Sequence, residues 1–366
     1  MAAARRGRGA GAIYPQSWQP DPHFDQRRWN TTLFKCLGKV KPIDFVRYNR
    51  SNIGNLFRSR GFKTSHDLSL CWGRKQNWRL GESDMLEDPV QHPEAFASLK
   101  GSTVVMMGDS MMHNLYEVSQ CVRRANHLSA TLEWVSCPLG DVKDWATFIR
   151  KYDHATLLVV NFGAHFNVDG VFSGVAVPGS DAAAYRRNLR AFQKWATLHV
   201  RSGLQPSLLW IENKAQHFDG GTYYRDSLGV KDGCEREVGG CQCTKLKDEW
   251  INASDWRNRI ASPIVRKAGV PIMPSFASSL GMWEDHNGID CTHFCHNGPQ
   301  MRHDVQQLWT HVLRDGQGLR APTARIVSVE AVTAAMALSM GLALFSFWYL
   351  RKAKKREMEP GRNVGS

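Results

Sequence analysis

Thr103-Val-Val-Met-Met-Gly-Asp-Ser110 is the stretch of this chain that decides its fold. Its apolar first half has the length and composition of a buried strand, and Gly-Asp-Ser consists of residues common in turns. A helical pattern follows over residues 111–126. A strand that enters a helix through so tight a turn is typical of a parallel α/β sheet, with Ser110 exposed at the sheet edge.

Strands and helices alternate along the rest of the chain. Further strands are expected at residues 132–137, 156–162, 207–212 and 270–276, and further helices at 141–152, 181–202, 252–268 and 299–313. This alternation predicts an α/β fold, a three-layer sandwich whose parallel central sheet is covered by helices on both faces. Ligands bind such sheets at the carboxyl ends of the strands.

The flanks of this regular region differ from it in composition. We expect a flexible basic leader over residues 1–29, a loop-rich section with Cys and Trp over 30–100, a catalytic domain over 101–318, a transmembrane helix over 327–350 and a basic cytoplasmic tail over 351–366.

The uncharged run AVTAAMALSMGLALFSFWYL at residues 331–350 predicts the membrane span. About 20 apolar residues cross the hydrocarbon core as a helix. Aromatic residues crowd the end of the run and RKAKKR follows it, as expected on the cytoplasmic side. A buried core helix is the alternative, but such a helix rarely lacks a polar face over this length. The larger part of the chain is therefore expected outside the cytoplasm.

Cysteines and glycosylation sequons favour the same compartment. The chain has nine cysteines, and sequons begin at Asn30, Asn49 and Asn252. An odd count leaves at least one thiol free or paired elsewhere. The start MAAARRGRGAGAIYPQ lacks the apolar core of a signal peptide. Either the sequence begins late or the chain inserts by its tail alone, and we expect the first.

The insertion at residues 214–250 breaks the alternation with Gly-rich sequence and Cys234, Cys241 and Cys243. We interpret it as a loop held by disulfides, with a zinc site as the weaker alternative because the Cys spacing suits zinc poorly. No cofactor or catalytic metal is expected.

About half of the net charge of +13 lies in the two ends of the chain. Arg5, Arg6 and Arg8 stand in the Gly/Ala-rich start of the leader, and a Lys/Arg cluster follows residue 350. The domain itself has no basic cluster with interleaved aromatic residues, which argues against a nucleic-acid partner.

Ser110 is the candidate nucleophile. A serine hydroxyl needs a neighbouring base, and negative charge on a substrate carbonyl would be stabilised by a backbone N–H at the start of the helix. An ordinary helix N-cap is the alternative.

Asp290-Cys-Thr-His293-Phe-Cys-His-Asn-Gly-Pro supplies a candidate base. The carboxylate of Asp290 can orient one ring nitrogen of His293 and leave the other free to take the serine proton. His296 is a competitor that lacks an acid at the matching distance. Cys291 and Cys295 are expected to hold this loop through disulfides.

Further substrate or oxyanion contacts are expected near these residues. Asn161 and Gly163 end a predicted strand, and an Asn amide can donate to an oxyanion. A turn is the alternative, because both residues are common where strands stop. His165 is a candidate substrate contact, and Gly140 a candidate further backbone donor.

Three blocks of this chain resemble the PC-esterase group, which includes the plant trichome-birefringence-like proteins. Gly108-Asp-Ser-Met-Met-His-Asn114 is similar to the group's first block, Asn161-Phe-Gly-Ala-His165 to its Asn-x-Gly-His block, and Asp290-Cys-Thr-His-Phe-Cys295 to its Asp-Cys-x-His-Trp-Cys signature. The sequence departs from the group at Phe294, in its C-terminal anchor and in its N-terminal section.

The resemblance implies a modified SGNH-hydrolase fold, with Ser110 as nucleophile activated by Asp290 and His293, and Asn114 beside them. It also implies a Golgi or secretory setting and acetyl transfer to, or removal from, sugar hydroxyls. The expected partners are an acyl donor and a glycan acceptor. The alternatives are an esterase for acetyl or lipid esters only, and a glycan-binding protein that has lost turnover.

Overall fold

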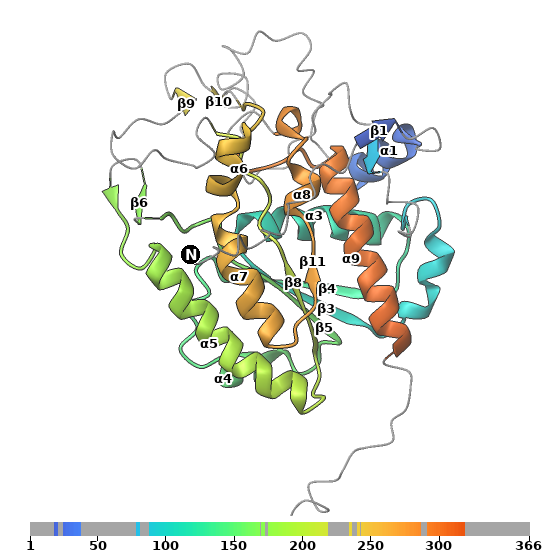
Figure 1. Ribbon diagram of the computed structural model, residues 1–366. Helices are drawn as coiled ribbons and strands as arrows, with labels where there is room; N and C mark the ends of the chain where they lie inside the picture. The colour runs from blue at the N-terminus through green and yellow to red at the C-terminus, as the bar shows by residue number, and fades with distance from the viewer. Residues whose placement is uncertain are drawn as a thin grey trace, which may run out of the picture. The chain divides into compact units, whose positions relative to one another are not determined.

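The structure is a computed structural model that describes residues 18–20, 25–37, 78–80, 88–168, 170–172, 175–218, 234–235, 240–241, 243–286 and 291–318. Its centre is a five-stranded sheet in the order β11-β8-β5-β3-β4, in which every neighbouring pair is parallel (Figure 1). The strands are β3 (Thr103–Gly108), β4 (Thr131–Ser136), β5 (Leu157–Asn161), β8 (Ser207–Ile211) and β11 (Ile272–Met273). The predicted α/β fold with a parallel central sheet is confirmed.

The sheet is buried on both faces, and β3 shows why. Val104 and Met106 pack into one hydrophobic cluster, while Val105 and Met107 pack into a second. Successive side chains of a strand point to opposite faces, so a strand buried on both sides is apolar throughout.

Helices cover the two faces separately. They are α1 (Gln26–Leu37), α3 (Ser110–Ala125), α4 (Trp145–Ile149), α5 (Ala182–Arg201), α6 (Asp248–Ser254), α7 (Trp256–Lys267), α8 (Phe276–Ser279) and α9 (Pro299–Gly318). α3 and α9 pack on one face through residues such as Val118 and Trp309. α4, α5 and α7 pack on the other through residues such as Trp145, Phe192 and Val265. The result is the predicted three-layer sandwich.

Three predicted elements have different bounds in the structure. The helix expected at 141–152 begins only after Asp144, whose carboxylate accepts from two backbone N–H groups of α4. The helix expected at 252–268 is two helices that meet at Asp255. The last strand is reduced to two residues, which lie between Pro271 and Pro274.

The N-terminal section contains a helix that the sequence pattern did not predict. α1 packs along α3 and buries Trp29 and Leu33 in the core. Two short strands, β1 (Trp18–Pro20) and β2 (Trp78–Leu80), pair antiparallel.

Short elements complete the described residues. They are the 3₁₀ helices η3 (Pro93–Leu99), η4 (Arg150–Tyr152) and η5 (Trp283–Asp285), and the strand pairs β6 (Val171–Phe172) with β7 (Val175–Ala176) and β9 (Cys234–Glu235) with β10 (Gly240–Cys241).

The order of strands places a ligand site at one position on the sheet. β4 lies on one side of β3, and the chain then crosses to form β5 on the other side. α/β sheets bind ligands where the order reverses in this way, beyond the carboxyl ends of the strands. Ser110 follows β3 and Asn161 ends β5, so both lie at this position.

Several expectations fall on residues outside the described ones. These are the apolar run 331–350, the basic tail, most of the leader and the sequon at Asn49. Within the residues that the structure describes, no helix combines the length and apolar character that a membrane crossing needs. Of the other sequons, Asn252 is exposed on α6, whereas Asn30 on α1 is buried.

Candidate active site

Ser110 is the first residue of α3 and follows a tight exit from β3. Gly108 is required there, because a Cβ at this position would overlap the backbone oxygen of Asn161. Asp109 is the N-cap, and its carboxylate accepts from the Met111 N–H at 3.0 Å. The first N–H groups of a helix have no intrahelical partner, so the Ser110 N–H is directed out of the helix end beside its own hydroxyl.

His293 is the ring that meets this serine. Its Nε2 lies 2.8 Å from the Ser110 Oγ, and its side chain is only 5% exposed. When the serine hydroxyl donates to Nε2, the ring proton resides on Nδ1. The alternative base, His296, lies elsewhere: its Nε2 is 3.8 Å from the Glu117 Oε2. Asp290, the expected partner of Nδ1, lies outside the described residues.

The loop that carries His293 is buried from residue 291 to residue 297. A disulfide joins Cys291 to Cys243 at the end of the insertion, over a sequence separation of 48. Cys295 is disulfide-bonded as well. The expectation that disulfides hold this loop is confirmed. Among the described cysteines, Cys137 is unpaired and buried, in keeping with the odd cysteine count.

A histidine pair holds the backbone of the same loop. The Nδ1 of His286 lies 3.1 Å from the carbonyl oxygen of His293, and its ring packs against Phe294, tilted by 35°, at a centroid distance of 4.2 Å. The Nε2 of His286 lies 2.7 Å from the Nδ1 of His217, whose Nε2 reaches the carbonyl of Leu280 at 3.1 Å. Burial lowers the pKa of His217 to about 4, which keeps that ring neutral.

Asp109 joins the nucleophile turn to the next strand. Its Oδ2 accepts from the backbone N–H groups of Gly163, at 3.2 Å, and Ala164, at 2.9 Å. The N–H of Gly163, a predicted oxyanion donor, is therefore bound to Asp109. A carboxylate that accepts several backbone N–H groups holds both segments in one arrangement.

Asn161 has one amide hydrogen committed and one available. Its Nδ2 donates to the carbonyl of Ile211 on β8 at 2.8 Å. This bond fixes the orientation of the amide, because the carbonyl of Ile211 can only accept. A primary amide carries two N–H groups, so the second can still serve a ligand. Gly163 is required beside it, because a Cβ there would lie 2.6 Å from the Asn213 amide nitrogen.

The remaining predicted contacts differ in their placement. Gly140 has φ +59°, and a Cβ there would overlap the ring of Phe162. Its N–H makes a turn hydrogen bond to Cys137 at 3.3 Å, which is long. The side chain of His165 is exposed, one residue beyond the segment that Asp109 holds.

Asn114 lies one turn after Ser110 on α3, and its side chain is 1% exposed. Neither its amide nitrogen nor its amide oxygen has a hydrogen-bond partner among the described residues. A buried amide without partners is costly, and such groups are commonly satisfied by a ligand or a bound water.

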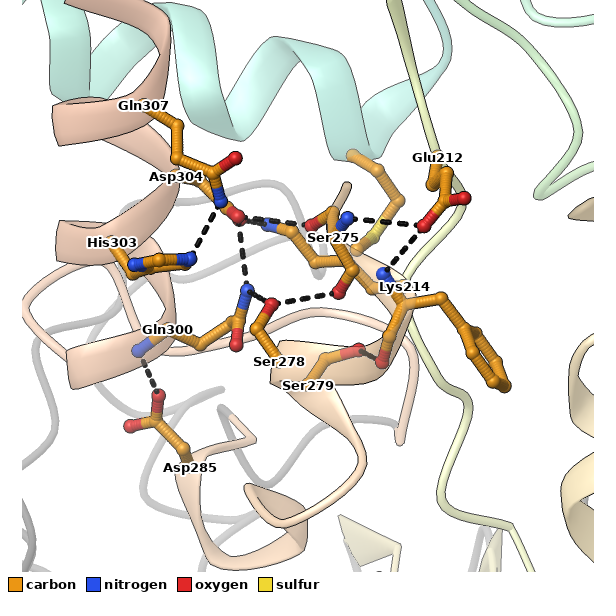
Figure 2. A network of polar contacts seen from close by, with 12 residues as sticks. Glu212, Lys214, Ser275, Ser278, Ser279, Asp285, Gln300, His303, Asp304 and Gln307 are labelled. Atoms are coloured by element: carbon orange, nitrogen blue, oxygen red, sulfur yellow. Dashed lines mark hydrogen bonds and ion pairs between the residues drawn. The ribbon is translucent and has the colours of Figure 1, made fainter. Parts of the chain in front are cut away.

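A buried polar network lies behind the site, between the end of β8 and α9 (Figure 2). Lys214 forms an ion pair with Asp304 at 2.6 Å, and both side chains are almost fully buried. Ser275 and Gln300 each donate to the Asp304 Oδ1 at 2.9 Å. The Nζ of Lys214 also lies 5.4 Å from the ring centroid of Phe294, next to His293. The network ties three segments together beneath the His293 loop.

Arg257, a second buried cation besides Lys214, links further segments around the site. Arg257 on α7 donates to the carbonyl of Phe166 at 2.5 Å and to the Gln216 Oε1 at 2.9 Å. Gln216 in turn donates to the hydroxyl of Thr292, which precedes His293, at 3.2 Å. Burial lowers the pKa of Arg257 to about 10, so the guanidinium remains charged at neutral pH.

Metal chemistry has no candidate site in the described part of the chain, which contains no group of His, Cys, Asp and Glu side chains placed to hold an ion. The disulfide of Cys243 with Cys291 also removes one thiolate from the weaker zinc interpretation of the insertion.

Sequence reasoning missed Asp109, His286 and His217 as parts of this site. Asp109 lies within Gly108-Asp109-Ser110, directly before a predicted helix. Its role as the N-cap of that helix could therefore have been predicted. The two histidines carry no local signal, because their roles depend on how distant loops meet.

Comparison with known proteins gives no information on the function of this site. No family model matches the chain, and no curated protein matches it. One similar solved structure is that of a protein described as a GDSL-like lipase from Parabacteroides merdae, 12% identical, with a TM-score of 0.35. The alignment covers 58% of this chain and 97% of that chain. At this score the likeness carries no argument about function.

Proposed function

We propose that this protein is a serine-dependent enzyme that cleaves carboxylic esters through an acyl-enzyme on Ser110. The observation that carries the proposal is the 2.8 Å contact between the Ser110 Oγ and the His293 Nε2. A serine hydroxyl at a helix N-terminus, within hydrogen-bond reach of a buried and braced imidazole, is an activated nucleophile.

The first half of the reaction forms the acyl-enzyme. The Ser110 Oγ attacks the ester carbonyl carbon while its proton passes to the His293 Nε2. The tetrahedral intermediate then collapses, the bond to the leaving alcohol breaks, and the imidazolium returns the proton to the alcohol oxygen.

The second half repeats these steps with a new hydroxyl. The acceptor oxygen loses its proton to His293 and attacks the acyl carbon, and Ser110 is regenerated. A sugar hydroxyl as acceptor gives an O-acyltransferase, and water gives an esterase.

Donors for the oxyanion come from the same turn. The Ser110 N–H and the positive end of the α3 dipole lie beside the attacking oxygen. The second amide hydrogen of Asn161 is the candidate side-chain donor. We assign Asp290 the role of orienting the Nδ1–H of His293, on the motif Asp290-Cys-Thr-His293.

The substrate proposed is an acetyl ester of a glycan, with an acyl donor and a glycan acceptor as partners. It rests on the three motif blocks that resemble the PC-esterase group. The setting proposed is a single-pass membrane protein of the Golgi or secretory pathway, on the apolar run at 331–350 and the sequons.

Labelling with a fluorophosphonate tests the chemistry before any substrate is known. Wild type should label, whereas Ser110→Ala and His293→Ala should not, and His296→Ala should label as wild type does. Failure of correctly oxidised, folded wild type to label would count against an enzyme and favour a glycan-binding protein.

Product analysis then separates the two reactions. An acetyl donor supplied with a saturating glycan should yield acetylated glycan. Free acetate as the sole product would identify an esterase.

A further inference from the structure

One edge of the domain differs from the active-site edge in charge. In a parallel α/β fold the helices return against the strands, so their C-termini lie at the amino ends of the strands. Figure 1 shows α5, α7 and α9 ending on this side. Ser110 begins α3 at the opposite, carboxyl end of β3. We call the side on which α5, α7 and α9 end the amino edge. Its basic side chains are Lys100, Arg123, Arg124, Arg150, Lys151, Arg201, Arg266, Lys267 and Arg314.

The cations of the amino edge outnumber the acids there. None of them forms an ion pair with a residue of the described chain. The acids at or near this edge are Asp153, Glu94 and Glu133, the last of which lies 3.0 Å from His154, and Asp144 interacts with Arg150. Helix dipoles favour cations at helix C-termini, so each cation has a local explanation. Their sum is still a predominantly positive surface.

Exposed aliphatic side chains gather at the same edge. Leu198 is 63% exposed and Leu204 58% exposed, with Val200 between them at 37%. They lie in the last turn of α5 and the loop before β8. The other large apolar side chains that are exposed in the described residues, Val168 and Val177, lie beyond β5 on the carboxyl side. Helix dipoles do not explain an apolar cluster, which is costly to leave in water.

α9 also ends at this edge. α9 ends at Gly318, and its last exposed side chain described is Arg314. The uncharged run at 331–350 follows shortly afterwards in the sequence.

We propose that the amino edge rests on an anionic lipid bilayer. Cations attract anionic headgroups, and Leu198 and Leu204 enter the interface between them. A soluble acidic polysaccharide would match the charge but would not cover the aliphatic side chains. Ser110 lies at the opposite edge and therefore faces away from the membrane, open to a soluble glycan. The inference does not depend on the catalytic role of Ser110.

The experiment measures the proximity of the edge to lipid. The full chain carries a thiol-reactive fluorophore at Leu204→Cys or, as the opposite-edge control, at Val168→Cys. Cys137 does not compete, because it is buried and its pKa is raised to about 11. Each protein is incorporated into phosphatidylcholine vesicles with or without phosphatidylserine, with nitroxide lipid as the quencher.

Quenching should occur at position 204 in anionic vesicles, fall at high salt and be absent at position 168. The variant Arg201→Glu/Arg266→Glu/Lys267→Glu should lose it, since three cations contribute roughly a hundredfold to partition onto anionic lipid. Reversal of Arg186, Arg187 and Arg190, exposed on the amino-terminal half of α5, is the matched control and should leave it intact.

Equal quenching at both positions, or none at position 204, would overturn the proposal. So would a fluorescence change with polygalacturonate in the absence of quenching by vesicles, because the edge would then bind glycan. Fluorophosphonate labelling of Ser110 should be unchanged in the triple variant, which separates this test from that of the catalytic proposal.

Discussion

The Nδ1 of His217 lies 2.7 Å from the Nε2 of His286, and the outer nitrogen of each ring contacts a backbone carbonyl, of Leu280 and His293 respectively. A carbonyl only accepts, so both outer nitrogens carry hydrogen, and the inner contact needs one more. Two neutral imidazoles supply only two N–H groups. The pair therefore holds one extra proton when all three bonds form.

His286 should act on catalysis through the position of His293. His286→Leu removes the donor to the His293 carbonyl, and a displacement of about 1 Å costs about 10²-fold in rate. We expect kcat to fall by about that factor with little change in KM. His286→Gln keeps an amide donor and should recover part of the loss. Equal kcat for the two variants would show that the hydrogen bond to His293 has no positioning role.

Buried neutral histidines should make the fold acid-sensitive. Burial lowers the pKa of His217 and of His303 to about 4, from about 6.5 when unfolded. The unfolded chain then binds more protons between these values, so each histidine removes about 3 kcal/mol of stability as pH falls from 6.5 to 4. Burial raises the pKa of Asp255 to about 6, which acts in the opposite direction.

Chemical unfolding at pH 7 and pH 4.5 measures this effect. His303 accepts from the Gln307 amide at 2.6 Å, and the His303→Gln variant keeps an acceptor without a titrating group. Its loss of stability on acidification should be smaller than that of wild type by about 2 kcal/mol, the contribution of one histidine. An unchanged loss would remove His303 from the account.

Local pattern gave the sheet and the position of Ser110, because both depend on a few adjacent residues. The run Thr103–Gly108 is apolar throughout, as only a strand buried on two faces requires. The contact of Ser110 with His293 was predicted because a serine nucleophile needs a neighbouring base, and not from any periodicity in the sequence. The partners of Asp109 and His286 could not be predicted, because they depend on the paths of loops after other strands. α1 was missed because a helix of 12 residues that stands between irregular segments gives little local signal.

Removal of one partner of the buried ion pair should destabilise the fold severely. Lys214→Met or Asp304→Leu leaves an uncompensated buried charge, at a cost of about 3–5 kcal/mol. The double variant Lys214→Met/Asp304→Leu removes both charges and should cost much less than the sum of the single changes. Urea unfolding measures all three. Additive losses would mean that the two side chains do not interact.

Asp109→Asn should show whether Asp109 only caps α3 or also holds the segment after β5 in place. Asp109 caps α3 and also accepts from the N–H groups of Gly163 and Ala164. An amide in its place turns an NH₂ group toward at least one of these donors. Hydrogen bonds to a charged group contribute about 1.5–3 kcal/mol, so we expect a loss of that size together with a lower kcat.

Asp144 provides the matched control, because it caps α4 in the same way and has no contact beyond its own helix turn and Arg150. Asp144→Asn should change stability little and leave kcat unchanged, because Asn and Asp are equally good N-cap residues. Thermal unfolding and initial rates on an aryl acetate give the two readouts for each variant. If Asp109→Asn behaved like Asp144→Asn in both, Asp109 would be only a helix cap. A fall in kcat confined to Asp109→Asn would instead mean that the carboxylate holds the β5 turn in register with Ser110.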